Sequence, residues 1–142
     1  MEVHAEYGQL VSEAERREIA VTIARPVHEV DDFLGERSNW PAWASGLATG
    51  IERAGSDWIV QQEAGPARLR FLSDEPGRHD HVVTLPDGQE IHVPLRAAPS
   101  GTGSEVVLTL IRQSAMSDAE FARDTEWVRR DLDALKRLLE GG

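Results

Sequence analysis

Residues 19–43 read IAVTIARPVHEVDDFLGERSNWPAW, and this stretch decides the fold. Its first part, 19–24, is short and rich in β-branched residues, which predicts a strand that ends before Pro26. Pro26 suits the first turn of a helix, and Gly35 is a typical helix stop. Between them the apolar residues recur at helical spacing: Val27, Val30, Phe33 and Leu34. The stretch therefore predicts a strand followed directly by an amphipathic helix.

Two tryptophans follow, Trp40 and Trp43, in a segment that Asn39 is expected to cap as a second short helix. After Gly50 the pattern changes to short runs separated by Gly, Pro and Asp turn signals. These runs predict six further strands, at 48–53, 57–64, 67–73, 79–86, 89–98 and 105–113. Together with the first strand they make seven, linked largely by hairpins in antiparallel order.

The last predicted element is a long helix over residues 118–140. Ser117 and Glu120 have the spacing of a capping box, in which each side chain bonds the backbone N–H of the other residue. The apolar stripe of this helix consists of Phe121, Val128, Leu132, Leu135 and Leu139. An amphipathic helix that follows an antiparallel sheet is expected to cover one face of it, which gives an α+β fold.

Turn lengths and two-residue alternation predict which strand residues face the helix. We take a four-residue loop at 75–78 and a loop of two or four residues around Asp87-Gly88; a three-residue loop there would break the parity. The predicted inner face is Ile51, Trp58, Val60, Gln62, Leu69, Phe71, Val82, Thr84, Ile91, Val93 and Leu95. The predicted outer face carries His79, His81, Glu90, His92 and Arg96. The strand at 105–113 is apolar on both faces, so its inward face stays open.

Composition excludes several classes of protein. The 142 residues suggest one domain at 15–142 after a polar lead-in at 1–14. No apolar run approaches ~18 residues and the first residues lack a signal-peptide pattern, so we expect no membrane insertion and no secretory signal. The absence of cysteine excludes disulfides and thiolate sites, and a cytoplasmic protein is the simplest interpretation. A net charge of −10 disfavours nucleic acid and anionic membranes as partners.

The strand IAVTIARP, the helix VHEVDDFLG, the NWPAW stretch, the hairpin-linked strands and the long last helix together resemble the START-like, or SRPBCC, superfamily. The likeness is greatest to its bacterial polyketide cyclase/dehydrase-like and lipid-transport-like members. This resemblance implies a helix-grip fold, in which a curved seven-stranded antiparallel sheet wraps the C-terminal helix and leaves a deep cavity. It also implies that the cavity holds a hydrophobic small molecule such as a lipid or polyketide.

We therefore expect the protein to bind or transport a hydrophobic or aromatic small molecule between the sheet and the last helix. The expected ligand-binding residues are Trp40, Trp43, Trp58, Val60, Gln62, Leu69, Phe71, Val82, Thr84, Ile91 and Val93. Each tryptophan could instead fill the core, and Gln62 and Thr84 could bond locally. His81 and His92 are expected as diagonal neighbours on the outer face, where a chance metal could bridge them. No phosphate-loop, helical metal or nucleophile motif is present, so we expect no cofactor and no functional metal.

Two rival functions stay open. An enzyme of the polyketide cyclase/aromatase type would need an acid or base in the cavity, and Arg53, Arg112 and Asp124 are the candidates. Asp131, on the same helix as Asp124, could also reach the cavity rim. A protein–protein role, as in superfamily members that resemble the activator of the heat-shock ATPase chaperone, is the other rival. The two apolar faces of 105–113 would suit such a partner or a homodimer.

Overall fold

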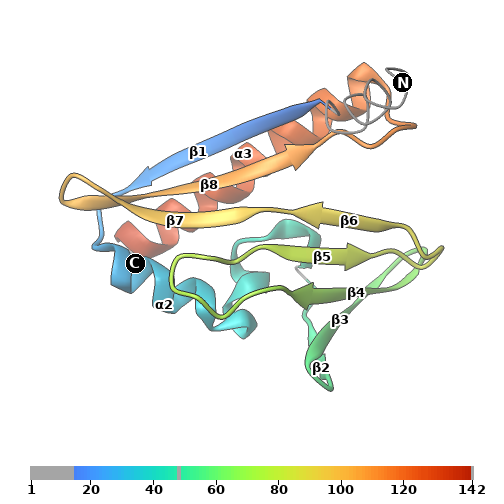
Figure 1. Cartoon of the computed structure of the whole chain (residues 1–142), viewed down its shortest axis with the longest axis horizontal. Coiled ribbons are helices and arrows are strands. Elements are labelled where there is room, and N and C mark those ends of the chain that lie inside the picture. Colours follow the sequence, from blue (N-terminus) through green and yellow to red (C-terminus); the bar gives the residue numbers. More distant parts are fainter. Residues whose placement is uncertain (1–14, 48, 142) are drawn as a thin grey trace, which may run out of the picture.

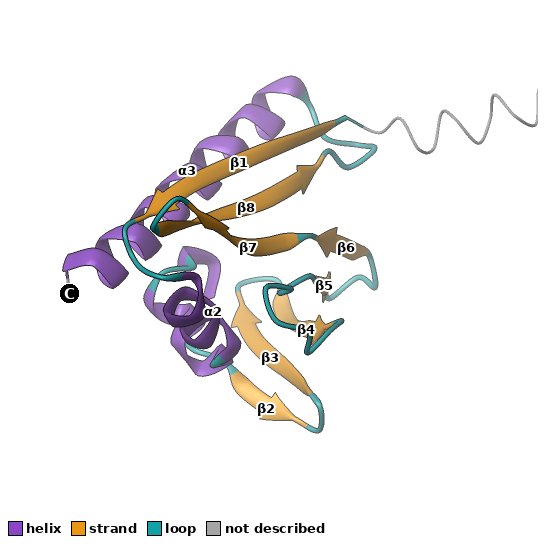
Figure 2. Cartoon of the chain, turned by 60° about the vertical axis from the view of Figure 1, so that its left-hand side comes forward, coloured by secondary structure: helices purple, strands orange, loops and turns teal. Residues whose placement is uncertain are grey.

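The computed structural model describes residues 15–47 and 49–141, in which antiparallel strands are packed against helices (Figure 1). The helical elements are α2 (Val27–Gly35), the 3-10 helices η1 (Arg37–Ala42) and η2 (Ser45–Leu47), and α3 (Asp118–Gly141). The strands are β1 (Arg16–Ile23), β2 (Glu52–Ala54), β3 (Asp57–Gln62), β4 (Gly65–Phe71), β5 (His81–Thr84), β6 (Glu90–Val93), β7 (Leu95–Ser100) and β8 (Gly103–Ile111). The polar lead-in predicted at residues 1–14 lies outside the described part of the chain. In Figure 2 the helices gather on one side of the strands, as an α+β fold requires.

The strands form a three-stranded sheet, ordered β1-β8-β7, and a five-stranded sheet, ordered β2-β3-β4-β5-β6. The predicted α+β class is confirmed, but the sequence predicted seven strands and the described residues form eight. The difference arises at Pro94, which divides the predicted strand 89–98 into β6 and β7. Proline has no N–H to give to a sheet, so pairing is interrupted there. The next N–H, that of Leu95, is instead donated to the Asp80 carboxylate at 2.9 Å.

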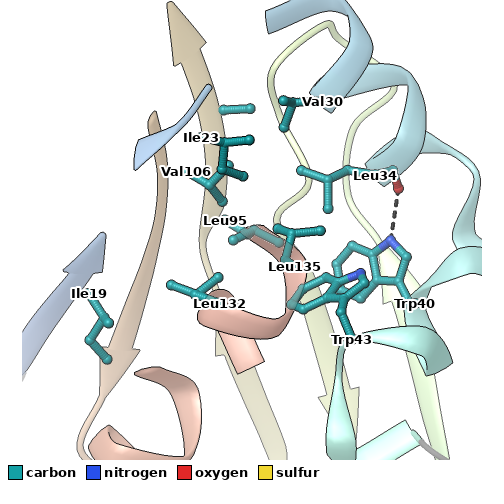
Figure 3. Close-up of a cluster of buried hydrophobic side chains, with 11 residues drawn as sticks. Ile19, Ile23, Val30, Leu34, Trp40, Trp43, Leu95, Val106, Leu132 and Leu135 are labelled. Carbon is teal, nitrogen blue, oxygen red and sulfur yellow. Dashed lines mark hydrogen bonds between the residues drawn. The ribbon is translucent and has the colours of Figure 1, made fainter. Parts of the chain in front are cut away.

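The first strand and the last helix form the main core. The capping box at the start of α3 is confirmed: the Ser117 N–H donates to Glu120 at 2.8 Å, and the Glu120 N–H donates to the Ser117 hydroxyl at 3.1 Å. From there α3 runs behind β1 and β8 (Figure 1). Leu132 and Leu135 on this helix are buried in the large hydrophobic cluster drawn in Figure 3, together with residues of β1, α2, η1, β7 and β8. The open question of β8 is also answered, because Val106 is fully buried while Val107, its neighbour, points outward beside Arg96.

The predicted inner face is wrong for one strand, β5. In the structure Leu69 pairs with Val83, and Phe71 pairs with His81, so His81 and Val83 face inward. Val82 and Thr84, predicted on the inner face, therefore lie on the outer face. Across β6 the pairs are His81 with Val93 and Val83 with Ile91, so Ile91 and Val93 do lie on the inner face.

Two loops cause this reversal. The Asp87-Gly88 turn has three loop residues, since the Leu85 N–H donates to the Gln89 carbonyl at 2.8 Å, and Gly88 adopts a positive φ of 93°. The loop before β5 runs longer than predicted, because residues 77–79 pair with β7 instead of β4. The His79 N–H donates to the Leu95 carbonyl at 2.8 Å, and pairing on the β4 side begins only after it, where the Leu72 N–H donates to the Asp80 carbonyl at 3.0 Å and Phe71 pairs with His81.

The segment after α2 also differs from its prediction. Asn39 does not cap a helix but lies inside η1, where its side-chain amide donates to the Phe33 carbonyl at 3.1 Å. Because Pro41 is within η1, the segment is a tight 3-10 helix that is interrupted before η2. This compact geometry holds Trp40 and Trp43 against the five-stranded sheet.

Candidate ligand-binding pocket

A pocket of about 250 Å³ lies between the inner face of the five-stranded sheet and α3. It lies beside the large hydrophobic cluster around α3 and a small one that centres on Val60, Ala67 and Leu69, and Leu47 and Phe71 pack against both clusters. The lining residues are Trp40, Trp43, Ala44, Gly46, Leu47, Val60, Gln62, Leu69, His81, Val83, Leu108, Trp127, Val128, Asp131 and Leu132. Most of them are apolar, and among them only His81 and Asp131 carry ionisable groups, so the pocket suits a largely apolar guest.

An aromatic cluster closes the inner end of this pocket. The Trp40 ring centroid lies 5.0 Å from that of Trp43, 5.1 Å from that of Phe71 and 5.1 Å from that of His81. The contacts with Phe71 and His81 are edge-to-face, an arrangement that places a positive ring edge on a negative ring face. Trp40 and His81 line the pocket, while Phe71 lines a second cavity on the other side. Trp40 and its neighbours therefore form a wall between two cavities.

His81 is the buried ionisable group of the pocket. Its Nδ1 lies 3.0 Å from the backbone carbonyl oxygen of His79, which can only accept. We therefore assign the proton of the neutral ring to Nδ1, which leaves Nε2 as a hydrogen-bond acceptor. Nε2 has no hydrogen bond to any other described residue. Burial lowers the pKa of His81 from 6.5 to about 4, so the ring is neutral at pH 7.

Trp43, which also lines the pocket, carries an unpaired polar atom. Its indole Nε1 is buried and is the one buried side-chain nitrogen or oxygen without a partner in the described part of the chain. The neighbouring Trp40 shows the usual arrangement, because its Nε1–H donates to the Leu34 carbonyl oxygen at 2.8 Å (Figure 3). Buried donors normally have a partner, so the N–H of Trp43 is an exception, and it is enclosed by the protein rather than open to the pocket.

The second cavity is a polar groove of about 830 Å³ that opens on the other side of the aromatic wall. In it Arg37 donates to Nδ1 of His79 at 2.8 Å, and Nε2 of His79 lies 2.7 Å from the Asp31 carboxylate. Because arginine can only donate, Nδ1 of His79 must accept and Nε2–H must donate to Asp31. Burial lowers the pKa of His79, although the bond to Asp31 opposes this effect. The groove thus holds a neutral histidine between two charged partners.

A chain of hydrogen bonds crosses the mouth of the pocket. Trp127 on α3 donates its indole N–H to the Ser45 hydroxyl, which in turn donates to the Asp131 carboxylate at 2.7 Å. Burial raises the pKa of Asp131, and the bond from Ser45 opposes that shift. Since Trp127 remains 44% exposed, it covers the mouth from the solvent side. The mouth is polar while the interior is apolar.

Comparisons with known proteins bear on the fold. No protein-family model matches the sequence. Among curated proteins, the multidrug resistance protein MdtC of Edwardsiella ictaluri is 34% identical over 96 residues, which is 62% of this chain and 9% of that protein. Among solved structures, the Aha1 dimer from Colwellia psychrerythraea is 16% identical with a TM-score of 0.67, covering 89% of this chain and 96% of that one.

Two further solved structures are similar to this chain. CalU16 from Micromonospora echinospora is 20% identical with a TM-score of 0.65, over 89% of this chain and 74% of its own. DynU16, from the dynemicin biosynthetic locus, is 18% identical with a TM-score of 0.66 over 87% of this chain, which spans 46% of DynU16. The chain has the helix-grip fold that these structures share. At these identities the likeness concerns the fold alone.

The helix-grip pocket brings together part of the predicted binding set. Trp40, Trp43, Val60, Gln62 and Leu69 line it. Trp58 and Phe71 lie on the same sheet face but line the groove. Ile91 and Val93 are on the inner face without lining the pocket, and Val82 and Thr84 are on the outer face because of the two loop lengths.

The predicted catalytic candidates lie outside the pocket. Arg53 is exposed, lines the groove and stacks over Trp58 at 5.1 Å. Arg112 is bound to Asp118 at 2.7 Å and to Glu15 at 3.0 Å, and its hydrogen bonds to these carboxylates raise its pKa. Asp124 lines neither cavity, whereas Asp131 does reach the pocket. The expected placement of His81 and His92 together on the outer face is wrong, because these side chains point to opposite faces of the sheet.

Three residues of the groove network were missed in the sequence, and one of them left a signal. Asp31 lies four residues after Val27 and one after Val30, so it shares the buried stripe of α2. A carboxylate on such a stripe needs a partner, and here it accepts from His79 and from the Gly77 N–H at 2.8 Å. Arg37 and His79 carry no such pattern, since their roles depend on the long loop before β5.

Among the described residues, no helix is both long and apolar enough to cross a membrane.

Proposed function

We propose that the protein binds a small hydrophobic or aromatic molecule in the pocket between the five-stranded sheet and α3. The observation that carries this proposal is a cavity of about 250 Å³ whose walls are mainly apolar and aromatic and whose ionisable groups number two. Transfer of an apolar guest from water into such a cavity is favourable by roughly 25 cal/mol per Å² of buried apolar area. The resemblance to the START-like superfamily supports the same proposal, since it implies a cavity that holds a hydrophobic ligand.

Blocking the cavity tests the proposal directly. Ala44 lines the pocket, whereas Ala42 on η1 is exposed, so Ala44→Trp and Ala42→Trp form a matched pair. We expect naphthalene to bind the wild-type protein and Ala42→Trp with equal affinity, as measured by saturation-transfer NMR. Ala44→Trp should lose at least tenfold in affinity, about 1.4 kcal/mol, because the indole occupies the space of the guest.

Native mass spectrometry of the freshly purified protein provides an independent test. A co-purifying small molecule that is absent from Ala44→Trp would support the proposal. Equal naphthalene binding to the wild-type protein and Ala44→Trp would contradict it, provided that both variants unfold cooperatively near the wild-type Tm.

His81 favours a second candidate function, an enzyme of the cyclase/aromatase type. Its ring lines the pocket with Nε2 unpartnered among the described residues, the position that a general base needs, although a pKa of about 4 makes it a weak base at neutral pH. In an aldol closure Nε2 would take the proton from the carbon between two carbonyls. That carbon would attack a distant carbonyl, the resulting alkoxide would take the proton back from Nε2, and the hydroxyl would then leave with a neighbouring hydrogen as water. A linear aromatic triketone serves as the probe. If the protein is an enzyme, the wild-type protein should cyclise the triketone faster than His81→Gln does. If the protein is a carrier, the triketone should be recovered unchanged.

Self-association also stays a prediction. The outer face of β8 presents the half-buried Val107, Thr109 and Ile111, and the similar Aha1 structure is described as a dimer. Light scattering coupled to size exclusion would measure the mass in solution. If the protein forms a dimer through this face, Val107→Lys should convert the dimer to a monomer.

A further inference from the structure

The mouth of the pocket carries a carboxylate without a direct counter-ion. Asp131 lines the pocket from α3, and it takes part in none of the ion pairs among the described residues. No described lysine or arginine lines the pocket. Arg130, the preceding residue of α3, is exposed and weakly lowers the pKa of Asp131 without pairing with it. A negative charge therefore stands alone at the edge of an apolar cavity.

A hydrogen bond fixes where this carboxylate lies. Its Oδ1 accepts from the Ser45 hydroxyl at 2.7 Å, and Ser45 stands in the chain between Ala44 and Gly46, which both line the pocket. The same hydroxyl accepts from the indole N–H of Trp127, one helical turn before Asp131 on α3. The carboxylate thus lies between α3 and η2, at the rim of the pocket.

The carboxylate can accept further hydrogen bonds. Its two oxygens offer about four acceptor positions, and Ser45 is its one donor in the described part of the chain. Oδ2 remains accessible, because Trp43 Nε1 is the one fully buried side-chain nitrogen or oxygen without a partner among the described residues. Burial raises the pKa of Asp131, which means that its charged form is less well solvated than in water. A cationic donor on a guest would relieve that cost.

The surface of α3 beside Asp131 continues into the apolar interior. Val128 and Leu132 both line the pocket, and Leu132 is 1% exposed. Residues three and four apart lie side by side on a helix, so Val128 is a neighbour of Asp131 on this surface. A guest whose apolar body packs against Val128 and Leu132 would hold a substituent at the carboxylate.

The volume of the pocket limits the size of that body. A dry apolar cavity of about 150 Å³ holds one benzene ring, and drug-sized ligands occupy roughly 300–1,000 Å³. The pocket, at about 250 Å³, lies between these limits and so admits up to two fused rings. Its indole walls favour a flat molecule that can stack on them or meet them edge to face.

Charge determines which substituent suits the mouth. An anionic group would be repelled by Asp131 and by the net charge of −10. An ammonium group would form a charge-assisted hydrogen bond, which is about twice as strong as a neutral one. The mouth is partly open, with Trp127 44% exposed, so the ammonium keeps part of its hydration there and avoids most of the desolvation cost of the interior.

We propose that the pocket selects an aromatic amine, with a flat apolar body of up to two fused rings in the interior and a protonated amino group on the Asp131 carboxylate at the mouth. Ser45 is then a positioning residue, which orients the carboxylate. This inference rests on the proposed function, because it names the class of ligand that the pocket takes.

Four probes share the naphthalene ring and differ in charge at one position. 2-Naphthylmethylamine is protonated at neutral pH, 2-naphthylmethanol is neutral and nearly the same size, 2-naphthoate is an anion, and naphthalene has no substituent. In calorimetric titration of the wild-type protein, the amine should bind about tenfold more tightly than the alcohol, because of one charge-assisted hydrogen bond. 2-Naphthoate should bind more weakly than naphthalene. Equal affinities for the amine and the alcohol would overturn the inference.

Two variants of α3 assign the preference to one carboxylate. Asp131→Asn and Asp133→Asn each remove one negative charge, but Asp133 is exposed and lines neither cavity. Asp131→Asn should lower the amine-to-alcohol affinity ratio by about tenfold, whereas Asp133→Asn should keep the wild-type ratio. This ratio cancels any uniform change in the pocket, and circular dichroism verifies that each variant is folded. An unchanged ratio in Asp131→Asn would show that the carboxylate serves only to hold α3 to Ser45.

NMR titration of the Asp131 carboxyl carbon detects the contact directly. An ammonium group beside a carboxylate favours its charged form, so the bound amine should lower the pKa of Asp131 relative to the bound alcohol. The same pKa with both guests would contradict the contact.

Ala44→Trp separates binding in the pocket from binding to the acidic surface. It should exclude the amine and the alcohol alike, and amine binding that survives in this variant would contradict the inference. If none of the four probes binds the wild-type protein, the proposed function itself fails. If naphthalene and the alcohol bind, Ala44→Trp excludes them and the amine has no advantage, the function stands and the choice of an amine is wrong.

Discussion

The two cavities of the protein share one aromatic wall but differ in almost every other respect. The groove has charged residues of both signs on its walls, among them Asp31, Arg37 and Arg78. The pocket has mainly apolar walls and no arginine or lysine. Each receives one buried histidine from the same short segment, His79 in the groove and His81 in the pocket. The difference lies in what surrounds two side chains that are only two residues apart.

This comparison shows how partners decide what a buried histidine can do. His79 is fixed by Arg37 on one nitrogen and by Asp31 on the other, so neither nitrogen is available to a ligand. His81 is fixed only at Nδ1, by the carbonyl of His79, and Nε2 stays available. The groove network thus positions the backbone that orients the histidine of the pocket. The following predictions test how separate the two cavities are.

The largest effect is expected from removal of the wall itself. Trp40→Ala should lower the free energy of unfolding by about 3–5 kcal/mol, because Trp40 is 3% exposed and contacts Trp43, Phe71 and His81. It would also join the pocket to the groove. Urea denaturation measures the change, and Trp127→Ala is the control, since the 44% exposed Trp127 should cost far less. Equal losses of unfolding free energy in the two variants would contradict the structural role of the aromatic wall.

Acidification should reveal the buried histidine of the pocket through its effect on the free energy of unfolding. The unfolded chain protonates His81 near pH 6.5, while the folded chain does so only near pH 4. Between these values the unfolded state binds more protons, so the free energy of unfolding should fall as the pH falls through that window, by roughly 3 kcal/mol in total. Burial lowers the pKa of His79 as well, which acts in the same direction.

Unfolding experiments from pH 7 to 4 measure this acid dependence. His81→Phe should flatten the curve, and the exposed His28→Gln on α2 provides the control. A wild-type slope retained in His81→Phe would show that other groups govern the acid transition.

A smaller effect is expected from the groove network. Asp31→Ala should cost about 2 kcal/mol, because it removes the acceptor of both the His79 ring and the Gly77 N–H. The exposed Asp32, its neighbour on α2, provides the control Asp32→Ala. If the wall isolates the cavities, naphthalene affinity should be the same in both variants. A selective loss of affinity in Asp31→Ala would show instead that the groove shapes the pocket.

Local features of this fold could be predicted from sequence, and distant ones could not. The capping box of α3 and the two-residue turn Gly55-Ser56 depend on neighbouring residues, and the structure has both. The loop before β5 depends instead on residues far away in sequence, such as Asp31, which accepts from Gly77. No rule for short turns could supply its length.

The reversal of β5 shows how such an error spreads. Each of the two loops that flank β5 changes the predicted parity by one residue, and the two changes cancel beyond it. As a result β3, β4 and β6 have their predicted inner faces, and β5 alone is inverted. This single inversion exchanged Val82 and Thr84 for His81 and Val83, and so hid the ionisable group of the pocket.

The break at Pro94 has a consequence for how this scaffold could be adapted. The large cluster, built from α3, α2 and the three-stranded sheet, holds most of the buried apolar residues, whereas the five-stranded sheet contributes a small cluster of its own. The pocket lies between the two, so one of its walls belongs to each. Changes on β3, β4 and β5 can alter the size and polarity of the cavity while the principal core stays intact. Positions on the five-stranded sheet that do not contact Trp40, unlike Phe71 and His81, are those at which ligand choice can change with the least effect on the principal core.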